Sequence, residues 1–334
     1  MTRRIIFRTA ASESVGFGHL RRCLTLAEAL RARRSECFFA IHGGAAGVDE
    51  ARRAGFDAVP VAVDDQGSGV AAGDPDAIVA DSYDFDVAHY RGFRKLTRTL
   101  VVLDDGGDRA LPADVVINPA ADAVRAYDSS SISVRLLGPK YALLRSSFEA
   151  EPCREVRQEV RRILVTLGGG DAFGLSAQIA DAVSCFSPRL RVDVVLGPFA
   201  REDAALEQLA ERRAVHLHRN PRDMRALMVA ADIAISGGGQ TTYELAATGT
   251  PTVALCLAEN QRANLQSLAA LGILQVVEAR TADRLRTELI AALAGVISDP
   301  ERRLKMSGNG RAVVDGKGAT RVADAIVERT GGDS

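Results

Sequence analysis

Short apolar runs alternate with amphipathic stretches along most of the chain. Residues 4–8, 77–80 and 99–103 are almost continuously apolar, which is typical of strands buried on both faces of a sheet. Residues 20–30 instead repeat their apolar positions at helical spacing, with Leu20, Leu24 and Ala27 on one side. Buried strands that alternate with helices predict a parallel sheet covered by helices on both faces.

The same rhythm covers residues 1–147, which we predict to form a first Rossmann-like domain. Its expected strands are residues 4–8, 37–41, 58–61, 77–80, 99–103 and 114–118, and its expected helices are residues 20–30, 45–53 and 87–96. Residues 64–73 are rich in Asp and Gly and predict a surface loop.

A polar segment, residues 146–158, precedes a second series of strands and helices. We therefore expect a second Rossmann-like domain over residues 148–334. The predicted strands are residues 163–167, 192–196, 215–218, 233–236, 252–255 and 274–277, and the predicted helices are residues 175–183, 203–212, 223–230, 241–247, 260–270, 282–297, 301–306 and 320–329. We expect two α/β domains facing each other across a cleft, with one of the last helices crossing back to the first domain.

Composition narrows the class of protein. The 334 residues are 47% hydrophobic and 25% charged, as in soluble globular proteins. Lys and Arg total 42 against 43 Asp and Glu, so the net charge of −1 argues against nucleic acid as a partner. No apolar run is long enough to span a membrane, and the N-terminus lacks a secretory pattern, so we expect a cytoplasmic protein, most simply a monomer.

The cysteines and histidines do not form a metal-binding pattern. The five cysteines, Cys23, Cys37, Cys153, Cys185 and Cys256, contain no C-x-x-C pair and predict reduced thiols. His216 and His218 share one face of a predicted strand without a third ligand, so we interpret them as structural. We predict no metal and no cofactor.

A glycine loop joins the first strand to the first helix. Gly16 and Gly18 lie in this loop, and His19 falls on the first helical turn. A strand, a glycine loop and a helix N-terminus together favour binding of phosphate or developing negative charge. The helix dipole disfavours imidazolium, so His19 is expected to be neutral and able to accept a proton. The alternative is that His19 only caps a backbone group.

Several polar residues follow the predicted strands of the first domain. Ligands of parallel α/β sheets collect beyond the carboxyl ends of the strands. The residues at these ends are His19, Asp81, Tyr83, Asp104, Asp105 and Asn118. The run 104–108 has the letters of a D-D-x-x-D metal motif, but its two glycines after a strand indicate a turn rather than the long helix that this motif requires.

A second glycine loop is the strongest local signal in the chain. A predicted buried strand opens at Ser236 into Gly237, Gly238 and Gly239, and Gln240, Thr241 and Thr242 begin a helix with exposed N–H groups. This arrangement favours a diphosphate, and Glu244 is placed to accept hydrogen bonds from two ribose hydroxyls. The alternative is a tight connection without a ligand. Gly168 and Gly169 form a similar loop after the strand at 163–167.

Asn260 and Gln261 follow the next strand, at 252–255. Asn260 is a good residue to cap the helix that begins there, and its place at the same sheet edge makes it equally a candidate for the cleft. The sequence leaves both interpretations open.

These motifs carry a resemblance to a known family. The runs Gly-Phe-Gly-His-Leu-Arg-Arg and Ser-Gly-Gly-Gly-Gln-Thr-Thr-Tyr-Glu, followed by Glu-Asn-Gln, resemble the UDP-sugar hydrolases of pseudaminic acid biosynthesis, which have the GT-B fold. Residues 81–83, 103–105, 114–118, 138–145 and 167–171 extend the likeness from about residue 4 to residue 275. The chain is more distantly similar to the N-acetylglucosaminyltransferases that make lipid II.

The resemblance implies a role for each matched residue. The implied catalytic residues are His19, the base that activates or orients water, and Tyr83 and Asn260, which hold the sugar and help to place that water. The remaining implied contacts to a UDP-sugar substrate come from the matched motifs: Gly16, Gly18, Arg22, Gly168, Gly169, Ser236, Gly237, Gly238, Gly239, Gln240, Thr241, Thr242, Glu244 and Gln261. The implied reaction breaks the anomeric C–O bond with inversion and releases UDP and the free sugar, without a metal.

Two features leave alternatives open. The run of glycines at 237–239 is richer than expected for the hydrolases and leans toward an inverting GT-B glycosyltransferase, in which an acceptor hydroxyl replaces water. Aromatic residues are only 5% of the chain, so stacking on a sugar depends on Tyr83, Phe17 or Tyr243. A third possibility is a non-catalytic protein that binds a nucleotide sugar.

Overall fold

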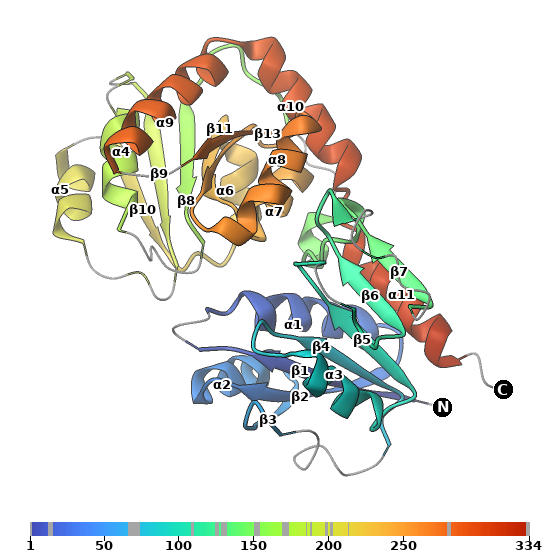
Figure 1. Cartoon of the computed structure of the whole chain (residues 1–334). Coiled ribbons are helices and arrows are strands. Elements are labelled where there is room, and N and C mark those ends of the chain that lie inside the picture. Colours follow the sequence, from blue (N-terminus) through green and yellow to red (C-terminus); the bar gives the residue numbers. More distant parts are fainter. Residues whose placement is uncertain are drawn as a thin grey trace. The chain divides into compact units, whose positions relative to one another are not determined.

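The computed structural model divides the chain into two compact units. The first contains Met1–Ser146 and Gly316–Ser334, and the second contains Ser147–Asp315 (Figure 1). The residues that the structure describes are 2–12, 16–65, 74–107, 110–123, 127, 132–149, 154–168, 174–184, 186–187, 189–197, 200, 203–212, 214–278 and 282–331.

A parallel sheet forms the centre of the first unit. Its seven strands are β1 (Arg3–Ala10), β2 (Ser35–His42), β3 (Asp57–Pro60), β4 (Ala77–Asp81), β5 (Thr99–Leu103), β6 (Val115–Asn118) and β7 (Val134–Leu137). They pair in the order β3-β2-β1-β4-β5-β6-β7, and every pairing is parallel. From β1 the successive strands are added toward one edge of the sheet, and from β4 they are added toward the other edge. Sheets of this kind bind ligands where the strand order reverses, here between β1 and β4.

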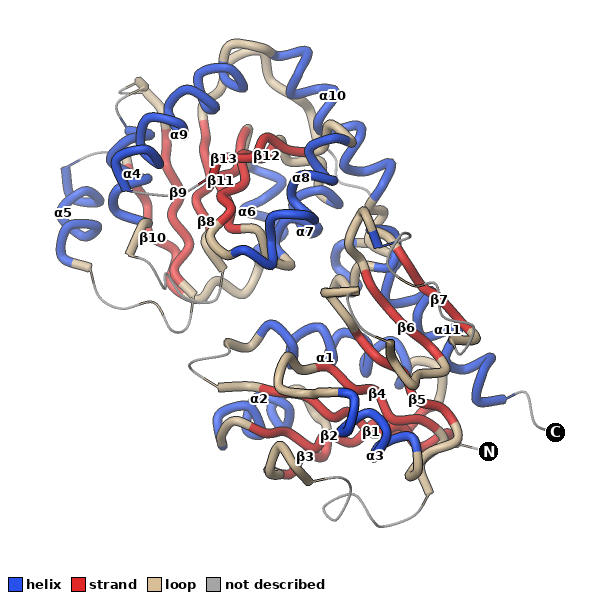
Figure 2. Tube along the Cα trace, in the orientation of Figure 1, coloured by secondary structure: helices blue, strands red, loops and turns tan. Residues whose placement is uncertain are grey.

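Helices connect these strands. They are α1 (Gly18–Arg31), α2 (Ala45–Arg53) and α3 (Val87–Arg94), with a 3₁₀ turn η2 (Pro139–Tyr141) (Figure 2). The right-handed crossover of parallel strands places α1 and α3 on opposite faces of the sheet. Under α3, Phe85, Tyr90 and Phe93 pack with Ile78 and Leu100 into a buried cluster, which explains why β4 and β5 are apolar throughout.

The last helix of the chain, α11 (Gly318–Gly331), belongs to the first unit. It packs against α1, β5 and η2. A Cβ at Gly318 would meet the backbone of Ala142, so only glycine permits this approach. Arg33 donates to the Asp324 carboxylate at 2.6 Å and so ties α1 to α11. The predicted return of a C-terminal helix corresponds to this helix.

The second unit contains a six-stranded parallel sheet. Its strands are β8 (Arg162–Thr166), β9 (Arg191–Leu196), β10 (Val215–Arg219), β11 (Ile233–Gly237), β12 (Thr252–Cys256) and β13 (Leu274–Glu278). The order is β10-β9-β8-β11-β12-β13, so the reversal lies between β8 and β11. The two units thus repeat one plan, and the predicted pair of Rossmann-like α/β domains is confirmed.

Helices surround the second sheet (Figure 2). They are α4 (Ser176–Ser184), α5 (Ala204–Arg212), α6 (Met224–Ala230), α7 (Thr241–Ala247), α8 (Arg262–Ala270), α9 (Ala282–Ile297) and α10 (Pro300–Val313), with short 3₁₀ turns η3 (Ser146–Phe148) and η4 (Glu259–Gln261). Arg303 on α10 is fully buried and donates to the carbonyl oxygens of Val296, Ile297, Arg157 and Gln158. These hydrogen bonds connect α10 both to the end of α9 and to residues 157–158, which precede β8.

The structure departs from several predicted elements, among them β7, α10 and α3. Strand β7 was missed, because only Leu136 of its four residues is buried and the alternation is too short to be read as a strand. Helix α10 is longer than predicted and continues through Gly308 and Gly310. Gly310 lets α10 approach α7, since a Cβ there would meet the carbonyl of Ala246. Helix α3 ends at Arg94, two residues earlier than predicted.

Candidate functional site

Polar side chains converge at the carboxyl ends of β1 and β4, where the first sheet reverses its strand order. Helix α1 begins at Gly18, so His19 lies on its first turn as predicted. The residue before the helix is Phe17, and no side chain caps the helix. The interpretation of His19 as a helix cap is therefore wrong. Its imidazole is buried, with 6% of the residue exposed, and turns toward β4 instead.

His19 pairs with the carboxylate that ends β4. Its Nδ1 lies 2.7 Å from Oδ1 of Asp81. An ionised carboxylate only accepts hydrogen bonds, so we assign the Nδ1 hydrogen to this contact. Nε2 is then the ring nitrogen that can accept a proton. A carboxylate that orients a histidine in this way is the arrangement found behind many general bases.

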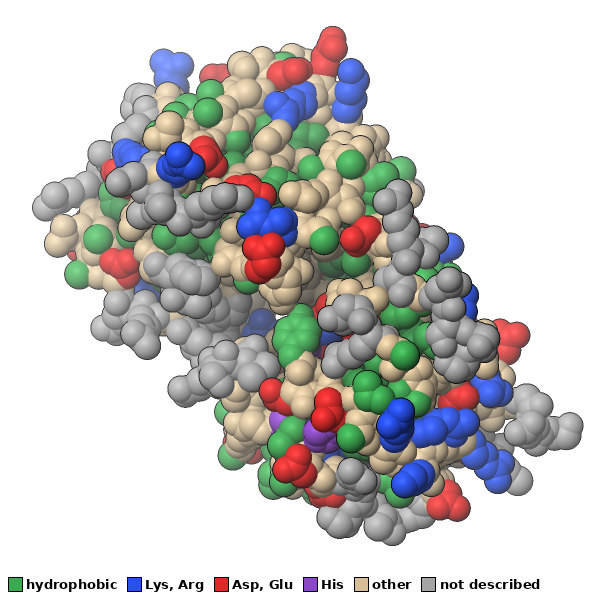
Figure 3. Space-filling view, viewed as in Figure 1, with side chains coloured by type: hydrophobic (Ala, Val, Ile, Leu, Met, Phe, Trp, Pro, Cys, Tyr) green, Lys and Arg blue, Asp and Glu red, His purple; other side chains and the backbone are tan. Residues whose placement is uncertain are grey.

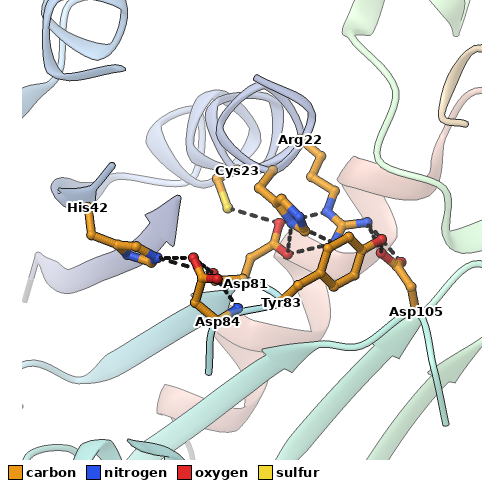
Figure 4. A network of polar contacts seen from close by, with 9 residues as sticks. Arg22, Cys23, His42, Asp81, Tyr83, Asp84 and Asp105 are labelled. Carbon is orange, nitrogen blue, oxygen red and sulfur yellow. Dashed lines mark hydrogen bonds and ion pairs between the residues drawn. The ribbon is translucent and has the colours of Figure 1, made fainter. Parts of the chain in front are cut away.

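Arg22, one turn further along α1, joins two aspartates. It donates to Asp81 through Nε and Nη2 at 2.6 and 2.5 Å, and to Asp105 through Nη1 at 2.8 and 3.0 Å (Figure 4). Burial would raise the pKa of Asp81, but Arg22 and His19 outweigh it and hold that pKa well below its usual range. Burial and Arg22 oppose each other at Asp105 in the same way, and its pKa is also lowered. Both carboxylates are therefore charged at neutral pH.

This network gives Arg22 a different task from the predicted one. Its guanidinium already donates hydrogen bonds to two carboxylates, and its side chain is 11% exposed. Arg22 therefore neutralises the aspartates that hold His19 and Tyr83. A direct contact to substrate stays a prediction.

Tyr83 combines an exposed ring with a fixed hydroxyl. The residue is 57% exposed, and its hydroxyl donates to Asp105 at 2.8 Å. Its ring meets the imidazole of His19 edge-on, with centroids 4.5 Å apart. Loss of water around the hydroxyl and the nearby Asp105 carboxylate raise the pKa of Tyr83, so the phenol stays protonated. Among the aromatics considered for stacking on a sugar, Phe17 and Tyr243 are buried, which leaves Tyr83.

A second buried group lies behind Asp105. The Tyr127 hydroxyl donates to the Asp104 carboxylate, and Asn118 donates to that hydroxyl at 3.0 Å. Asp104 also accepts from the backbone N–H of Gly107 at 2.9 Å, in a turn where Gly107 has a φ of 70°. The run after β5 is thus a turn, as predicted. Asp108 of that run lies outside the described residues.

The network contains no metal-type cluster and no reactive thiol. Within the described residues, no group of three or more His, Cys, Asp or Glu side chains could hold a metal ion. Cys23 contacts Asp81 at 3.5 Å, and burial together with this carboxylate raises the pKa of its thiol well above the usual value. Cys37 and Cys256 are also free thiols, while Cys153 and Cys185 lie outside the described part of the chain.

The visible surface has mixed charge. On the face shown in Figure 3, acidic and basic side chains are interspersed over both units. This pattern agrees with the balanced composition of the chain.

The second glycine loop lies at the corresponding position of the second sheet. Strand β11 ends at Gly237, and a Cβ there would lie 3.5 Å from the carbonyl oxygen of Leu167, which follows β8. The loops after β8 and β11 are therefore neighbours at the reversal of strand order. This is the position at which nucleotide-binding sheets hold their ligand.

The three glycines of this loop differ in their surroundings. A Cβ on Gly238 would come within 3.0 Å of Gln261 and Leu265, so a larger residue there would require these side chains to shift. A Cβ on Gly239 would meet nothing within 4 Å, so its exposed backbone borders open space. Packing explains the glycine at 238 and leaves the one at 239 unexplained.

Several predicted donors of this loop are already engaged. The N–H of Thr242 donates to the carbonyl of Gly239 at 3.0 Å, and the Thr242 hydroxyl donates to the same oxygen at 2.8 Å. The hydroxyl of Ser236, which is fully buried, donates to the carbonyl of Gly237. The prediction that the Thr242 N–H is exposed toward a ligand is wrong, because the chain tightens into a turn just before α7.

Asn260 and Gln261 are placed differently from expectation. Asn260 lies inside the turn η4 and is exposed, and α8 begins only after Gln261 with no side-chain cap. The interpretation of Asn260 as a helix cap is therefore wrong. Gln261 accepts from the Leu257 N–H at 3.2 Å, which fixes the end of β12. Asn260 belongs to the second unit, whereas His19 and Tyr83 belong to the first.

The other predicted residues lie at the expected edges of the two sheets. Gly16 has a φ of 79° and donates to the Ser12 carbonyl at 2.8 Å, so it shapes the loop before α1. Gly168 has a φ of 99° directly after β8. Glu244 is half-buried on the first turn of α7, which Thr241 begins one residue after Gln240. Gly169 lies outside the described residues.

Sequence reasoning found the members of the first network but not their pairing. It placed His19, Asp81, Tyr83 and Asp105 at one sheet edge. It did not assign Asp81 to His19, and it missed a contact between His42 of β2 and residues Ser82 and Asp84. The signal available was the position of His42 at the end of a predicted strand next to β1.

Residues 162–324 match the family described as the glycosyltransferase family 28 C-terminal domain. This segment of the chain is therefore similar to that domain. The match begins at β8 and includes the glycine loop after β11, which lies where the second sheet reverses its strand order.

The curated relatives have low sequence identity to this chain, and each of them extends beyond the segment that matches it. The spore coat polysaccharide biosynthesis protein SpsG of Bacillus subtilis is 29% identical over 63% of this chain and 63% of its own length. A Helicobacter pylori protein named pseudaminic acid cytidylyltransferase and UDP-2,4-diacetamido-2,4,6-trideoxy-beta-L-altropyranose hydrolase is 24% identical over 63% of this chain and 39% of its own. Uncharacterized protein MJ1062 of Methanocaldococcus jannaschii is 25% identical over 78% of this chain and 57% of its own. The chain thus spans less than two thirds of each of these relatives.

Solved structures establish the fold. The calicheamicin glycosyltransferase CalG4 superposes with a TM-score of 0.70 at 17% identity and covers 100% of this chain and 99% of its own. MurG of Acinetobacter baumannii superposes with a TM-score of 0.67 at 15% identity, over 97% and 99%. The chain therefore has the GT-B glycosyltransferase fold. None of the helices that the structure describes is long and apolar enough to cross a membrane.

Proposed function

We propose that this chain cleaves a UDP-linked amino or deoxy sugar, with water as the nucleophile, into UDP and the free sugar. The observation that carries the proposal is the contact between His19 and Asp81 at the reversal point of the first sheet. Support also comes from the family 28 domain and from the Helicobacter pylori relative, whose name includes hydrolysis of a UDP-sugar. We expect the protein to act in the cytoplasm.

The base in this reaction is His19. With Nδ1 donating to Asp81, Nε2 accepts a proton from water while the water oxygen attacks the anomeric carbon. Asp81 keeps its negative charge because Arg22 and His19 lie beside it, and it stabilises the imidazolium that forms. Attack from the side opposite the leaving group inverts the anomeric centre.

The leaving group is UDP. As the C–O bond breaks, its electron pair moves to the phosphate oxygen, and backbone N–H groups near that oxygen stabilise the added charge. We assign the diphosphate to the loop from Gly237 to Gln240, where the open backbone at Gly239 admits a phosphate. Glu244 is assigned to the ribose, and Tyr83 and Asn260 to the sugar. No step in this scheme requires a metal or cofactor.

A second function has a specific observation in its favour. The matched domain is named for glycosyltransferases, and the solved neighbours include CalG4 and MurG. In a transferase the same His19 removes the proton of an acceptor hydroxyl, and the sugar moves to that oxygen. The two functions differ only in the nucleophile, so they share every residue assigned above.

One incubation separates the two functions. The purified protein is mixed with UDP-sugars, including UDP-2,4-diacetamido-2,4,6-trideoxy-β-L-altropyranose, in ¹⁸O-labelled water without an acceptor. Hydrolysis releases UDP and places the label on the anomeric hydroxyl of the sugar. Binding of UDP without any turnover until an acceptor is added would favour the transferase. Binding without turnover under either condition would indicate a non-catalytic nucleotide-sugar-binding protein.

A further inference from the structure

A second histidine contacts the same loop that carries Asp81 and Tyr83. His42 ends β2 and is buried, with 5% of the residue exposed. Its Nε2 lies 3.1 Å from Oδ2 of Asp84 and 3.2 Å from the hydroxyl of Ser82 (Figure 4). The N–H of Asp84 in turn donates to the Ser82 hydroxyl at 3.0 Å. His42, Ser82 and Asp84 are called the His42 group below.

The three residue types are those of a hydrolytic triad, but the geometry excludes that role. In a triad the carboxylate and the hydroxyl bind opposite nitrogens of the imidazole. Here both meet Nε2, and Nδ1 is buried without a hydrogen-bond partner among the described residues. Ser82 is also buried, with 4% of the residue exposed, so it is not a nucleophile for an outside substrate.

The group instead holds one carboxylate at the surface. The Asp84 side chain is 50% exposed, whereas the two side chains that contact it are buried. Burial lowers the pKa of His42 more than Asp84 raises it, so the imidazole is neutral and Nε2–H donates to the carboxylate. An ordinary surface aspartate is not held by two buried polar groups, since burying them costs free energy.

The remaining oxygen of this carboxylate has no partner among the residues that the structure describes. Asp84 makes its side-chain contacts through Oδ2, and Oδ1 accepts no hydrogen bond from any residue that the structure describes. A carboxylate only accepts, so the group that binds there must donate, as a hydroxyl or an amide N–H does. A diphosphate would be repelled.

We propose that Asp84, held by His42 and Ser82, accepts a hydrogen bond from a hydroxyl or N-acyl N–H group on the sugar ring of the substrate. Asp84 is the specificity-determining residue, and His42 is its positioning residue. The inference rests on the proposed function, because it takes the sugar to lie beside His19 and Tyr83. Asp84 lies one residue after Tyr83 on the loop that β4 begins.

The experiment compares the affinities of UDP and UDP-sugars by titration calorimetry. The ligands are UDP, UDP-glucose and UDP-N-acetylglucosamine. The proteins are the unchanged chain, Asp84→Ala and the control Asp49→Asn, which changes an exposed aspartate on α2. The unchanged chain is expected to bind at least one UDP-sugar more tightly than UDP. Asp84→Ala should lose about tenfold of that preference, as for a hydrogen bond to a charged group, with UDP affinity unchanged.

His42 is tested by a conservative replacement. His42→Gln keeps a side-chain N–H donor for Asp84 and should retain the sugar preference within about threefold, whereas His42→Ala should lose as much as Asp84→Ala. A purely structural role would lower stability in both variants and leave the ratio of UDP-sugar to UDP affinity unchanged.

The possible failures are distinguishable. Unchanged sugar preference in Asp84→Ala overturns the inference alone, as does UDP binding without preference for any of the sugars. Absence of UDP binding in the unchanged chain removes the proposed function, and this inference with it.

Discussion

The two sheets reverse their strand order in the same way but present different groups at that point. In the first unit, side chains from α1, β4 and β5 form an ion network around Asp81 and Asp105. In the second unit, the corresponding loop exposes backbone at Gly239 and directs its hydroxyls to its own carbonyls. The first edge thus presents ionisable side chains, and the described loop of the second edge presents open backbone at Gly239.

This difference suggests how one fold divides its work. A histidine that accepts a proton needs a partner that fixes its tautomer, and Asp81 is this partner for His19. Burying the charged carboxylate of Asp81 costs free energy. A phosphate needs close approach to backbone N–H groups, which side chains obstruct. We therefore propose that the first unit carries the chemistry and that the second unit binds the nucleotide.

The largest expected effect concerns the charge balance of the first edge. Replacing Arg22 by Met leaves the buried Asp81 without its main counter-ion, so we expect the free energy of unfolding to fall by about 3–5 kcal/mol. Urea denaturation checks this value. Arg53→Met, on an arginine whose side chain is 70% exposed, is the control and should change little. A loss below 1 kcal/mol in Arg22→Met would show that the network is not needed for stability.

The second effect separates positioning from binding. Asp81→Asn preserves the shape of the side chain but allows the other tautomer of His19, so turnover is expected to fall about 100-fold while UDP affinity stays constant. Steady-state kinetics and UDP titration measure the two quantities. Equal losses in both would contradict the division between the edges.

The third effect tests the second edge. Gly239→Ala adds a methyl group that touches no protein atom, so stability should change by less than about 0.5 kcal/mol. UDP affinity should nevertheless fall about tenfold if a diphosphate approaches this backbone. Gly238→Ala is the matched comparison, because its methyl group strikes Gln261 and Leu265 and should cost about 1–3 kcal/mol of stability. Unaltered UDP binding in Gly239→Ala would move the diphosphate elsewhere.

The smallest effect is a dependence on pH. The pKa of Asp105 is lower in the folded chain than in the unfolded chain, so its stabilising contribution is full above about pH 5 and declines as the pH falls toward the folded value. The difference in unfolding free energy between the unchanged chain and Asp105→Asn should therefore be constant above about pH 5 and shrink between about pH 5 and pH 3.

The sequence predicted the fold well because the apolar runs mark nearly every buried strand. It missed β7, whose residues are half exposed, and it ended α10 early, because Gly308 and Gly310 read as helix breakers although Gly310 is needed for packing on α7.

The candidate site was predicted only in part. Strand ends identified His19, Asp81, Tyr83 and Asp105, since topology alone brings them to one edge. Which of these side chains form hydrogen bonds with one another depends on the side-chain orientations, which the spacing of residues in the sequence does not determine. The same holds for the contacts of His42 with Ser82 and Asp84. The residue type of Asn260 predicted a possible capping role, but Asn260 lies within the turn η4 and helix α8 begins only at Arg262.

The most direct test of this account is the turnover of a UDP-sugar by His19→Ala, with UDP affinity measured on the same preparation. We expect turnover to fall at least about 100-fold while the Kd for UDP is unchanged. His216→Ala, which removes an exposed histidine of the second unit, should match the unchanged chain in both measurements. Full turnover in His19→Ala would contradict the assignment of the base and the division of chemistry and binding between the two units.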